Sequence, residues 1–498
     1  MGIATLTDRF KNFPFFLVTL PLFFVLHGYR ENYGFIDVRD VGILAAGYII
    51  GTLLLFLTLF IIFRKTKPAA IATALLMVLF FFFSALHDFF TEHQTLKPFS
   101  KYSILLSVSV AGLLLLFIYF VQKQHTRQRF YFYLNLLMLL YIGLDIGALL
   151  VQAFGIIKKP SFSVEGMPFK SCDTCTKPTI YFLLFDEYAS SVSLRERFDF
   201  KNDLDSFLLS EGFSIQTKSF GNYDFTPFSI ASILNMSYIK GLDNPDAISV
   251  EDYSKSASLI RNAVLMDILS GQGYDIINYS IFDLKGHPAI TEESMLPVKT
   301  KLITSRTLSS VLVKDIGWMR ARYFPSFARD MMQVYRINNN KFIELVSQFA
   351  MADRKNPAFV YAHLEMPHPP YYYNKNGERR ADSLLFMETK TELPAVYLDY
   401  LQYTNMEIRK LIRKIRVGDP SAVIVLMGDH GYRHLLSAKT RLNLLQNMNA
   451  VFIPAGKKIQ LYDSISGVNQ FRVLLNGLFD QQYSLLKDSG TLLKERVQ

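Results

Sequence analysis

The stretch "AVIVLMGDHGYRH" (Ala422–His434) joins an unbroken apolar run to a Gly-Asp-His-Gly segment. A short run of consecutive apolar residues is typical of a strand that is buried on both faces of a parallel sheet. The glycines let the chain turn sharply after the strand, and they leave a carboxylate and an imidazole side by side at Asp429 and His430. The segment therefore predicts either a surface turn or a metal site at the end of a buried strand.

The chain from Thr179 onward repeats such strand-like runs between helical patterns. Strands alternating with helices indicate an α/β domain with a mainly parallel central sheet. We expect a linker over residues 158–178, rich in Pro, Ser, Gly and Lys, and a single outer domain over residues 179–498. Further strands are predicted at Thr179–Phe185, Tyr274–Ser280 and Pro357–Leu364, and helices at 200–213, 227–236 and 397–415.

The first third of the chain is dominated by apolar residues. Most of its apolar stretches reach the ~20 residues that cross a ~30 Å hydrocarbon core, so residues 1–157 are predicted to form a membrane domain of five helices. Lys and Arg are concentrated in alternate short loops, which predicts a cytoplasmic N-terminus. Five crossings then place the outer domain in the periplasm or outside the cell, on a protein integral to the cell (inner) membrane. The stretches are Phe13–His27, Val41–Phe63, Ala69–Leu86, Ser103–Gln122 and Phe130–Ile157.

The charge and the cysteines limit the possible partners and cofactors. The net charge of +10 comes partly from the membrane loops, and no basic cluster with interleaved aromatic residues is seen, so no nucleic-acid partner is expected. The two cysteines lie in "SCDTC", at Cys172 and Cys175. Outside the cytoplasm, a short disulfide is favoured over a redox pair or half of a zinc site.

Polar residues that suit metal binding or catalysis follow three of the predicted strands. In parallel sheets the ligand site lies beyond the carboxyl ends of the strands, so these residues should gather at one edge. Each also has an ordinary alternative, because a single carboxylate after a strand commonly caps a helix or stands in a loop. The residues are Asp186 and Glu187 after the first strand, Glu365 and His368 after the third, and Asp429 and His430 after the last.

Two histidines flank the end of the strand in "YAHLEMPHPPYYY". His363 lies inside the strand, where a hydrogen-bonded core histidine is the expected role. His368 lies between two prolines in a stiff loop, which suits a fixed contact to substrate. The tyrosines at 371–373 either pack the loop or form a wall of the site, and Arg433 and His434 are candidate anion contacts.

Thr226 directly precedes Pro227 at the start of a predicted helix. A threonine in this position is often an N-cap. The same position places the hydroxyl in the positive field of the helix N-terminus, which favours an alkoxide and an approaching anion. Metal coordination would lower the pKa of the hydroxyl further and make it a nucleophile. Thr226 is therefore either a cap or a nucleophile.

The order of the motifs "YFLLFDEY", "YDFTPFSIASIL", "HLEMPHPPY" and "VLMGDHGYR" resembles the alkaline phosphatase/sulfatase superfamily. The membrane anchor followed by an outer domain is similar to its membrane-bound branch, which includes lipoteichoic acid synthases and lipid A phosphoethanolamine transferases. The resemblance implies a divalent metal ion (zinc, manganese or magnesium) bound by Asp186, Thr226, Asp429 and His430. It also implies that Thr226 is the nucleophile and that His368 contacts the substrate head group. His363, Arg433 and His434 are further candidate substrate-binding residues.

The function implied is a membrane-anchored transferase. It would move a phospho-alcohol group (phosphoglycerol or phosphoethanolamine type) from a phospholipid donor to a glycan or lipid acceptor, through a covalent threonine intermediate. Two departures are visible. "FTPFS" lacks the C/S-x-P-x-R pattern of sulfatases, which argues against sulfatase chemistry, and Tyr432 replaces the acidic residue that usually follows Gly-Asp-His-Gly.

Two alternatives to the transferase stay open. One is a hydrolase of phosphate or sulfate esters with the same fold, in which water replaces the acceptor. The other is a non-catalytic membrane sensor or binding module. Asp145 favours the second alternative, because a carboxylate inside an apolar membrane stretch is often functional.

Overall fold

The computed structural model describes residues 3–93, 95–154, 161–291, 299–312, 325–381, 385, 394–433, 443–455 and 459–495. These residues form two compact units. The first unit holds the N-terminal helices up to residue 154 together with residues 299–312, and the second holds the other described residues from Ser161 onward. The boundaries predicted at residues 157 and 178 stay predictions.

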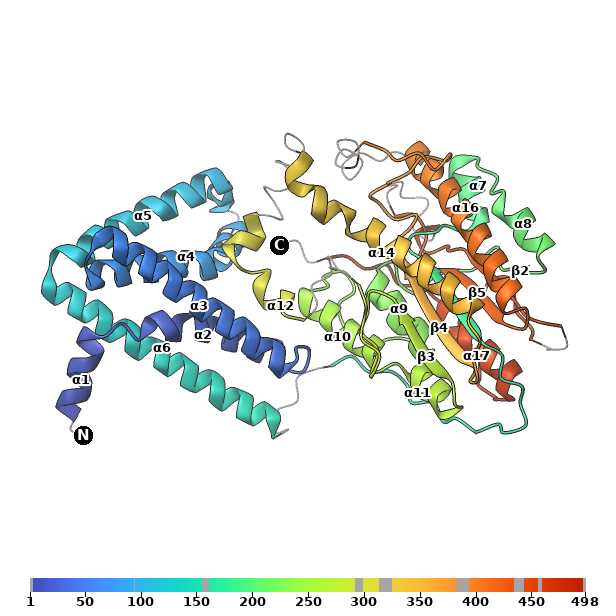
Figure 1. The fold of residues 1–498 in the computed structure, drawn as a ribbon, viewed down its shortest axis with the longest axis horizontal. Helices are drawn as coiled ribbons and strands as arrows, with labels where there is room; N and C mark the ends of the chain where they lie inside the picture. The colour runs from blue at the N-terminus through green and yellow to red at the C-terminus, as the bar shows by residue number, and fades with distance from the viewer. Residues whose placement is uncertain are drawn as a thin grey trace. The chain divides into compact units, whose positions relative to one another are not determined.

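The first unit is helical (Figure 1). Helices α2 to α6 cover the five predicted apolar stretches. Four of them, α3 to α6, are long and apolar enough to cross a membrane, whereas α2 has only 16 residues. The cytoplasmic position of the N-terminus stays a prediction. The elements are α1 (Ile3–Asn12), α2 (Phe16–Glu31), α3 (Val38–Phe63), α4 (Thr66–Glu92), the 3-10 helix η1 (Lys97–Ser100), α5 (Tyr102–Gln122), α6 (Gln124–Ala153) and α12 (Lys301–Thr304).

The short helix α12 packs against α2 within this unit, although it is far from α2 in the chain. A side chain at Gly28 would come within 2.9 Å of the Ile303 side chain, so the absence of a side chain there lets the two helices approach closely. Arg306 forms an ion pair with Glu31 at 3.2 Å. A segment that the sequence assigns to the outer domain therefore groups with the N-terminal helices.

Asp145 joins α6 to α2 by ion pairs. Its side chain is 2% exposed, and its carboxylate lies 2.8 Å from Arg30 Nη1 and 3.2 Å from His27 Nδ1. A buried carboxylate needs such partners, because an unpaired charge is costly in an apolar environment. These contacts give Asp145 a role in packing two helices.

Replacing Asp145 with alanine should destabilise the helical unit by roughly 2–3 kcal/mol. Arg30 would lose its buried partner but keep some contact with solvent, since it is 29% exposed. The measurement is the thermal unfolding of the detergent-solubilised full chain. Asp88→Ala on α4 is the matched control, because Asp88 is half exposed. Equal effects of the two substitutions would contradict this role of Asp145.

The second unit is built on a six-stranded sheet with the order β2-β6-β5-β1-β4-β3. The central strand β1 pairs in parallel with β4 and β5, and β4 pairs in parallel with β3. Strand β6 is antiparallel to β5 and also to the edge strand β2. The mainly parallel sheet confirms the predicted α/β fold. The strands are β1 (Ile180–Phe185), β2 (Ser214–Ile215), β3 (Asp275–Tyr279), β4 (Ala358–Leu364), β5 (Val423–Gly428) and β6 (Asn449–Phe452).

Helices cover both faces of this sheet (Figure 1). Tyr181 on β1 contacts Phe349 of α14, and the next residue, Phe182, contacts Phe471 of α17. Because successive side chains of a strand point to opposite faces, α14 and α17 lie on opposite sides of the sheet. The helices are α7 (Ser191–Phe198), α8 (Leu204–Ser210), α9 (Thr226–Asn235), α10 (Val250–Arg261), α11 (Val264–Gly271), α14 (Pro325–Met351), α16 (Pro394–Gly418) and α17 (Gly467–Phe479).

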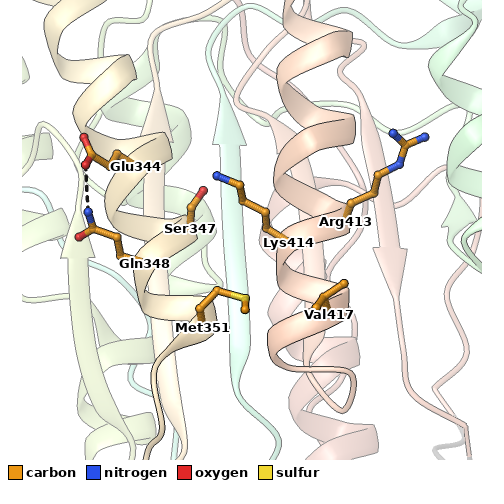
Figure 2. Close-up of a pocket in the computed structure, with 7 residues that line it drawn as sticks. All are labelled: Glu344, Ser347, Gln348, Met351, Arg413, Lys414 and Val417. Carbon is orange, nitrogen blue, oxygen red and sulfur yellow. Dashed lines mark hydrogen bonds between the residues drawn. The ribbon is translucent and has the colours of Figure 1, made fainter.

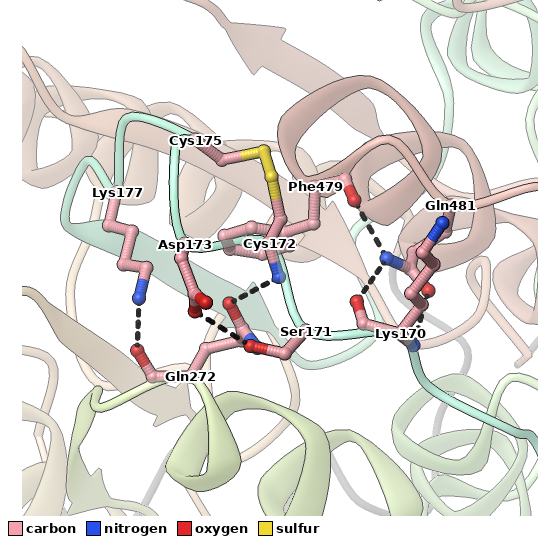
Figure 3. The surroundings of a disulfide bond; sticks show 9 residues. All are labelled: Lys170, Ser171, Cys172, Asp173, Cys175, Lys177, Gln272, Phe479 and Gln481. Atoms are coloured by element: carbon pink, nitrogen blue, oxygen red, sulfur yellow. Dashed lines mark hydrogen bonds between the residues drawn. A yellow bond between two sulfur atoms is a disulfide. The ribbon is translucent and has the colours of Figure 1, made fainter.

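The segment before β1 is held by a disulfide and by hydrogen bonds (Figure 3). Cys172 and Cys175 are bonded, as expected, with Cα atoms 5.5 Å apart. Lys177 donates a hydrogen bond to the Gln272 carbonyl at 3.0 Å. The Gln481 amide donates to the Lys170 carbonyl at 2.8 Å. The cysteines therefore belong to the attachment of this segment to the sheet domain.

Candidate metal centre

Three side chains meet where β1 and β5 end. Phe185, the last residue of β1, pairs with Gly428, the last residue of β5, so the residues that follow lie at the same edge of the sheet. Asp186, Asp429 and His430 each offer a ligand atom there, and these atoms lie within 4.8 Å of one another. All three residues are buried. The predicted gathering of strand-end residues is therefore present in the structure.

Thr226 faces this cluster from the N-terminus of α9. The N-cap of the helix is Phe225, so the threonine hydroxyl is not a capping group. Its one hydrogen-bond contact among the described residues is His430 Nε2, at 3.5 Å. Of the two roles that the sequence leaves open, the structure does not support the cap, and it places the hydroxyl beside the candidate metal ligands.

The unpaired atoms of the cluster fit a divalent cation. Among the described residues, the buried atoms Asp186 Oδ1 and Asp429 Oδ2 have no hydrogen-bond partner. They lie 3.6 Å and 3.3 Å from His430 Nε2. His430 Nδ1 lies 2.8 Å from the Gly431 carbonyl, which accepts a hydrogen bond and so assigns the proton to Nδ1. The Nε2 lone pair and two carboxylates then face one another, as in sites for zinc or manganese.

Backbone groups and a serine hold Asp429 in position. Its Oδ1 atom accepts hydrogen bonds from the backbone N–H groups of Glu187 at 3.0 Å and His430 at 2.9 Å. The Ser229 hydroxyl donates to the Asp429 carbonyl at 2.7 Å. Glu187 has a φ of +62°, which is unfavourable for a residue with a long side chain. This strain is tolerated at a position whose N–H orients a candidate ligand.

The two carboxylates respond differently to their surroundings. Burial alone would raise the pKa of Asp186, but the nearby imidazoles of His368, His363 and His430 lower it below its usual value. Burial and the neighbouring Asp186 charge raise the pKa of Asp429. Two buried carboxylates side by side repel each other, and a bound divalent cation would relieve this repulsion.

His368 and Arg433 lie together beside the cluster, and their roles as substrate contacts stay predictions. Arg433 Nη2 is 3.5 Å from His368 Nε2. The guanidinium also donates to the Asp224 carbonyl at 3.1 Å and lies 5.3 Å from the centre of the Phe225 ring. Arg433 is thus fixed next to the residue that precedes Thr226, where it can contact an anion at the helix N-terminus. His434 lies outside the described residues.

His363 points toward the metal cluster from inside β4. Its Nε2 atom is 3.9 Å from Asp186 Oδ2, and its Nδ1 atom is 3.3 Å from the Tyr361 hydroxyl. Within the described part of the chain Nε2 has no hydrogen-bond partner, so this is not the fully hydrogen-bonded core histidine that its position in a strand suggests. Its assignment as a substrate-binding residue stays a prediction.

Some residues of the site were not identified from the sequence. Ser229 is not among the predicted site residues, yet its hydroxyl holds Asp429 in place. Ser229 follows Thr226 by three residues, so both lie on one face of α9. This spacing could have identified Ser229 from the sequence. Tyr432 packs against the Tyr397 ring, with centroids 4.2 Å apart, so the position that is usually acidic in the family serves packing here.

Glu365 is a second buried carboxylate close to Asp186. Burial and the Asp186 charge raise its pKa to about 8. Between the ordinary value of 4.5 and about 8, the folded metal-free protein holds a proton that the unfolded chain does not hold. Glu365 therefore makes the folded state less stable as the pH rises through this range.

The stability of the metal-free full chain should fall less steeply with rising pH when Glu365 is replaced by glutamine. The measurement is the thermal midpoint in chelator from about pH 5 to about pH 8, where the wild type should fall more steeply than the variant. Glu344→Gln on α14 is the matched control, because Glu344 belongs to a groove away from the site. Parallel curves for wild type and Glu365→Gln would show that Glu365 does not titrate in this range.

A groove of about 650 Å³ lies between α14 and α16 (Figure 2). These helices lead into the amino ends of β4 and β5, whereas the metal ligands follow the carboxyl ends of β1 and β5. The groove contains none of the candidate site residues. Its lining residues are Glu344, Ser347, Gln348, Met351, Arg413, Lys414 and Val417.

The comparison of the sequence with known families finds one match. The sulfatase family model matches residues 241–463, a region that includes His363, His368, Asp429 and His430 but not Asp186 or Thr226. No curated protein matches the sequence.

The comparison with solved structures finds matches to transferases and sulfatases, including the following three. The integral membrane lipooligosaccharide phosphoethanolamine transferase A of Neisseria meningitidis is 13% identical, with 93% of this chain and 95% of that chain covered and a TM-score of 0.37. The periplasmic domain of the phosphoethanolamine transferase EptC of Campylobacter jejuni is 17% identical, with 64% of this chain and 95% of that chain covered and a TM-score of 0.37. The putative sulfatase YidJ of Bacteroides fragilis is 13% identical, with 62% of this chain and 75% of that chain covered and a TM-score of 0.38.

The match to the sulfatase family model over residues 241–463 agrees with the resemblance to the alkaline phosphatase/sulfatase superfamily. Residues 241–463 match the sulfatase family model, and four helices among the described N-terminal residues are long and apolar enough to cross a membrane.

Proposed function

We propose that the protein is a membrane-anchored, metal-dependent transferase. It moves a phospho-alcohol group, of phosphoglycerol or phosphoethanolamine type, from a lipid donor to a glycan or lipid acceptor. The observation that carries this proposal is the position of the Thr226 hydroxyl, which begins a helix without capping it and lies 3.5 Å from His430 Nε2. A nucleophile beside a set of unpaired metal ligands suits attack on a phosphate ester.

Thr226 acts as the nucleophile in this proposal. A divalent ion held by Asp186, Thr226, Asp429 and His430 would supply the positive charge that lowers the pKa of the hydroxyl. Thr226 Oγ1 releases its proton to solvent and forms a bond to phosphorus while the bond from phosphorus to the lipid alcohol breaks, leaving Thr226 esterified to the phospho-alcohol. The N-terminus of α9 favours both the alkoxide and the phosphate, because its backbone N–H groups carry partial positive charge.

His368 and Arg433 bind the phosphate and assist the leaving group. The Arg433 guanidinium pairs with an oxygen of the phosphate. His368 donates a proton or a hydrogen bond to the departing lipid alcohol. An acceptor hydroxyl then attacks the phosphorus of this intermediate and loses its proton, and the Thr226 oxygen leaves and takes up a proton, which restores the enzyme.

The N-terminal helices supply a reason for a lipid donor. An anchor of four or five membrane helices keeps the catalytic domain next to lipid head groups and raises their effective concentration. The proposed location is the cell membrane, with the N-terminus in the cytoplasm and the catalytic domain in the periplasm or outside the cell. Loop charges support this orientation.

A hydrolase is the second candidate, and the match to the sulfatase family model favours it. Sulfate esters are the less suitable substrate, because Thr226 occupies the position at which sulfatases need cysteine or serine. The metal-loaded full chain in phospholipid vesicles, with and without added glycan, separates the two reactions. A transferase places the head group on the glycan. Release of the same amount of free phospho-alcohol with and without the glycan would establish the hydrolase.

A further inference from the structure

Glu365 is a buried carboxylate beside the metal centre that has no part in the proposed reaction. Phe185 pairs with Leu364 in the parallel register of β1 and β4, so Asp186 and Glu365 are neighbours at the ends of these strands. Glu365 is only 3% exposed. The Asn339 side chain accepts a hydrogen bond from the Glu365 N–H at 2.7 Å and donates one to its carbonyl at 3.1 Å. The backbone is therefore fixed without help from the carboxylate.

The carboxylate of Glu365 lacks a cation. In the part of the chain that the structure describes, it accepts one long hydrogen bond, from Asn338 Nδ2 at 3.4 Å, and forms no ion pair with Lys, Arg or His. Such groups are rare in proteins because leaving a charge unpaired away from water is costly. A ligand that brings its own positive charge would supply the missing partner.

Aromatic side chains share the region around Glu365. The Tyr335 ring contacts the His368 ring, with centroids 5.9 Å apart. After burial, the Glu365 charge is the largest cause of the raised pKa of both Tyr335 and Tyr372, so the two phenols lie within its electrostatic reach. A carboxylate with tyrosines around it is a combination that binds ammonium groups, by charge-assisted hydrogen bonds and by cation–π contacts.

We propose that Glu365 is a specificity-determining residue that binds the ammonium group of the substrate. The substrate class is then a phosphate ester whose alcohol carries a primary or quaternary ammonium. This inference rests on the proposed function, since the phosphate of the same ester is bound at the metal centre beside His368 and Arg433. A head group without a cation, such as glycerol, leaves Glu365 without a partner and binds less tightly.

Calorimetric binding to the metal-loaded full chain in detergent tests this assignment without requiring turnover. The probes are O-phosphoethanolamine and glycerol 3-phosphate, which share a phosphate monoester and differ in the ammonium group. The wild type should bind the first about 10-fold or more tightly than the second. Glu365→Gln keeps the size of the side chain but removes the charge, so it should reduce this ratio to about one while leaving glycerol 3-phosphate binding unchanged.

Two further variants make the outcome decisive. Glu344→Gln makes the same chemical change in the groove between α14 and α16 and should keep the preference. Glu365→Asp keeps the charge and should keep part of the preference for O-phosphoethanolamine. This variant guards against the case in which Glu365→Gln simply fails to fold. A wild type without preference, or a Glu365→Gln variant that keeps it, would overturn the assignment. In either case, transfer of a head group from lipid by the wild type would still uphold the proposed function. Ammonium preference without any transfer or hydrolysis would instead refute the proposed function alone.

Discussion

Thr226→Ala should lower the rate of head-group transfer by roughly 10⁴-fold or more while leaving the fold intact. The hydroxyl lies 3.5 Å from His430 Nε2 and does not cap α9, so its removal takes away the nucleophile without removing a helix cap. The remaining residues could still bind the ester but could not form the covalent intermediate. The measurement is the initial rate of transfer from a labelled phospholipid, with the thermal midpoint measured alongside.

Two variants on the same helix serve as controls for Thr226. Thr226→Ser keeps a hydroxyl at the same position and should retain measurable activity. Ser232→Ala removes a hydroxyl that only donates to the Ser229 carbonyl within α9, so it should keep nearly full activity. A Thr226→Ala variant with the activity of the wild type would show that another group, or water, attacks the phosphate.

Asp429→Ala and His430→Ala should each weaken metal binding by more than roughly 100-fold. Each substitution removes one of the three ligand groups that lie within 4.8 Å of one another and leaves the others with unpaired polar atoms. Activity should fall with the loss of metal, because the charge that activates Thr226 is lost. The measurements are metal content after dialysis and a metal titration followed by calorimetry.

The control for the ligand variants is a carboxylate elsewhere in the same unit. Asp463 is half exposed and accepts hydrogen bonds from Thr217, so Asp463→Ala should keep the metal content of the wild type. Full metal occupancy in both Asp429→Ala and His430→Ala would contradict the proposed centre. Restored activity of either variant at high metal concentration would instead support it.

The sequence predicts four of the six strands of the sheet, and it misses β6 and β2 at one edge. β1, β4 and β5 are recognisable because each is a nearly continuous apolar run that is buried on both faces, whereas the opposite edge strand β3 is recognisable because it follows the turn at Gly271–Gly273. β6 begins with a polar residue, Asn449, and β2 has only two residues, so neither gives a periodic signal. Both are strands because of their antiparallel pairing with a neighbour. Such pairing depends on tertiary contacts that a local pattern does not contain.

The candidate site also contains residues whose proximity the sequence predicts and others whose proximity only the structure shows. Asp186, Asp429 and His430 could be expected to meet, because residues after parallel strands share one edge of the sheet. The proximity of Glu365 to Asp186 depends on the register between β1 and β4, which is known only from the structure. Residues 299–312 read as part of the outer domain, yet they group with the N-terminal helices through contacts such as Gly28 with Ile303. Those contacts also depend on tertiary packing.

Mass spectrometry of Thr226 tests the central proposal most directly. The metal-loaded full chain is mixed with labelled phospholipid in the absence of acceptor, quenched in acid and digested. We expect a peptide containing Thr226 that carries the phospho-alcohol, absent from Thr226→Ala and lost when acceptor is added before quenching. A labelled product formed at a normal rate with an unmodified Thr226 peptide, or an adduct on a different residue, would contradict it.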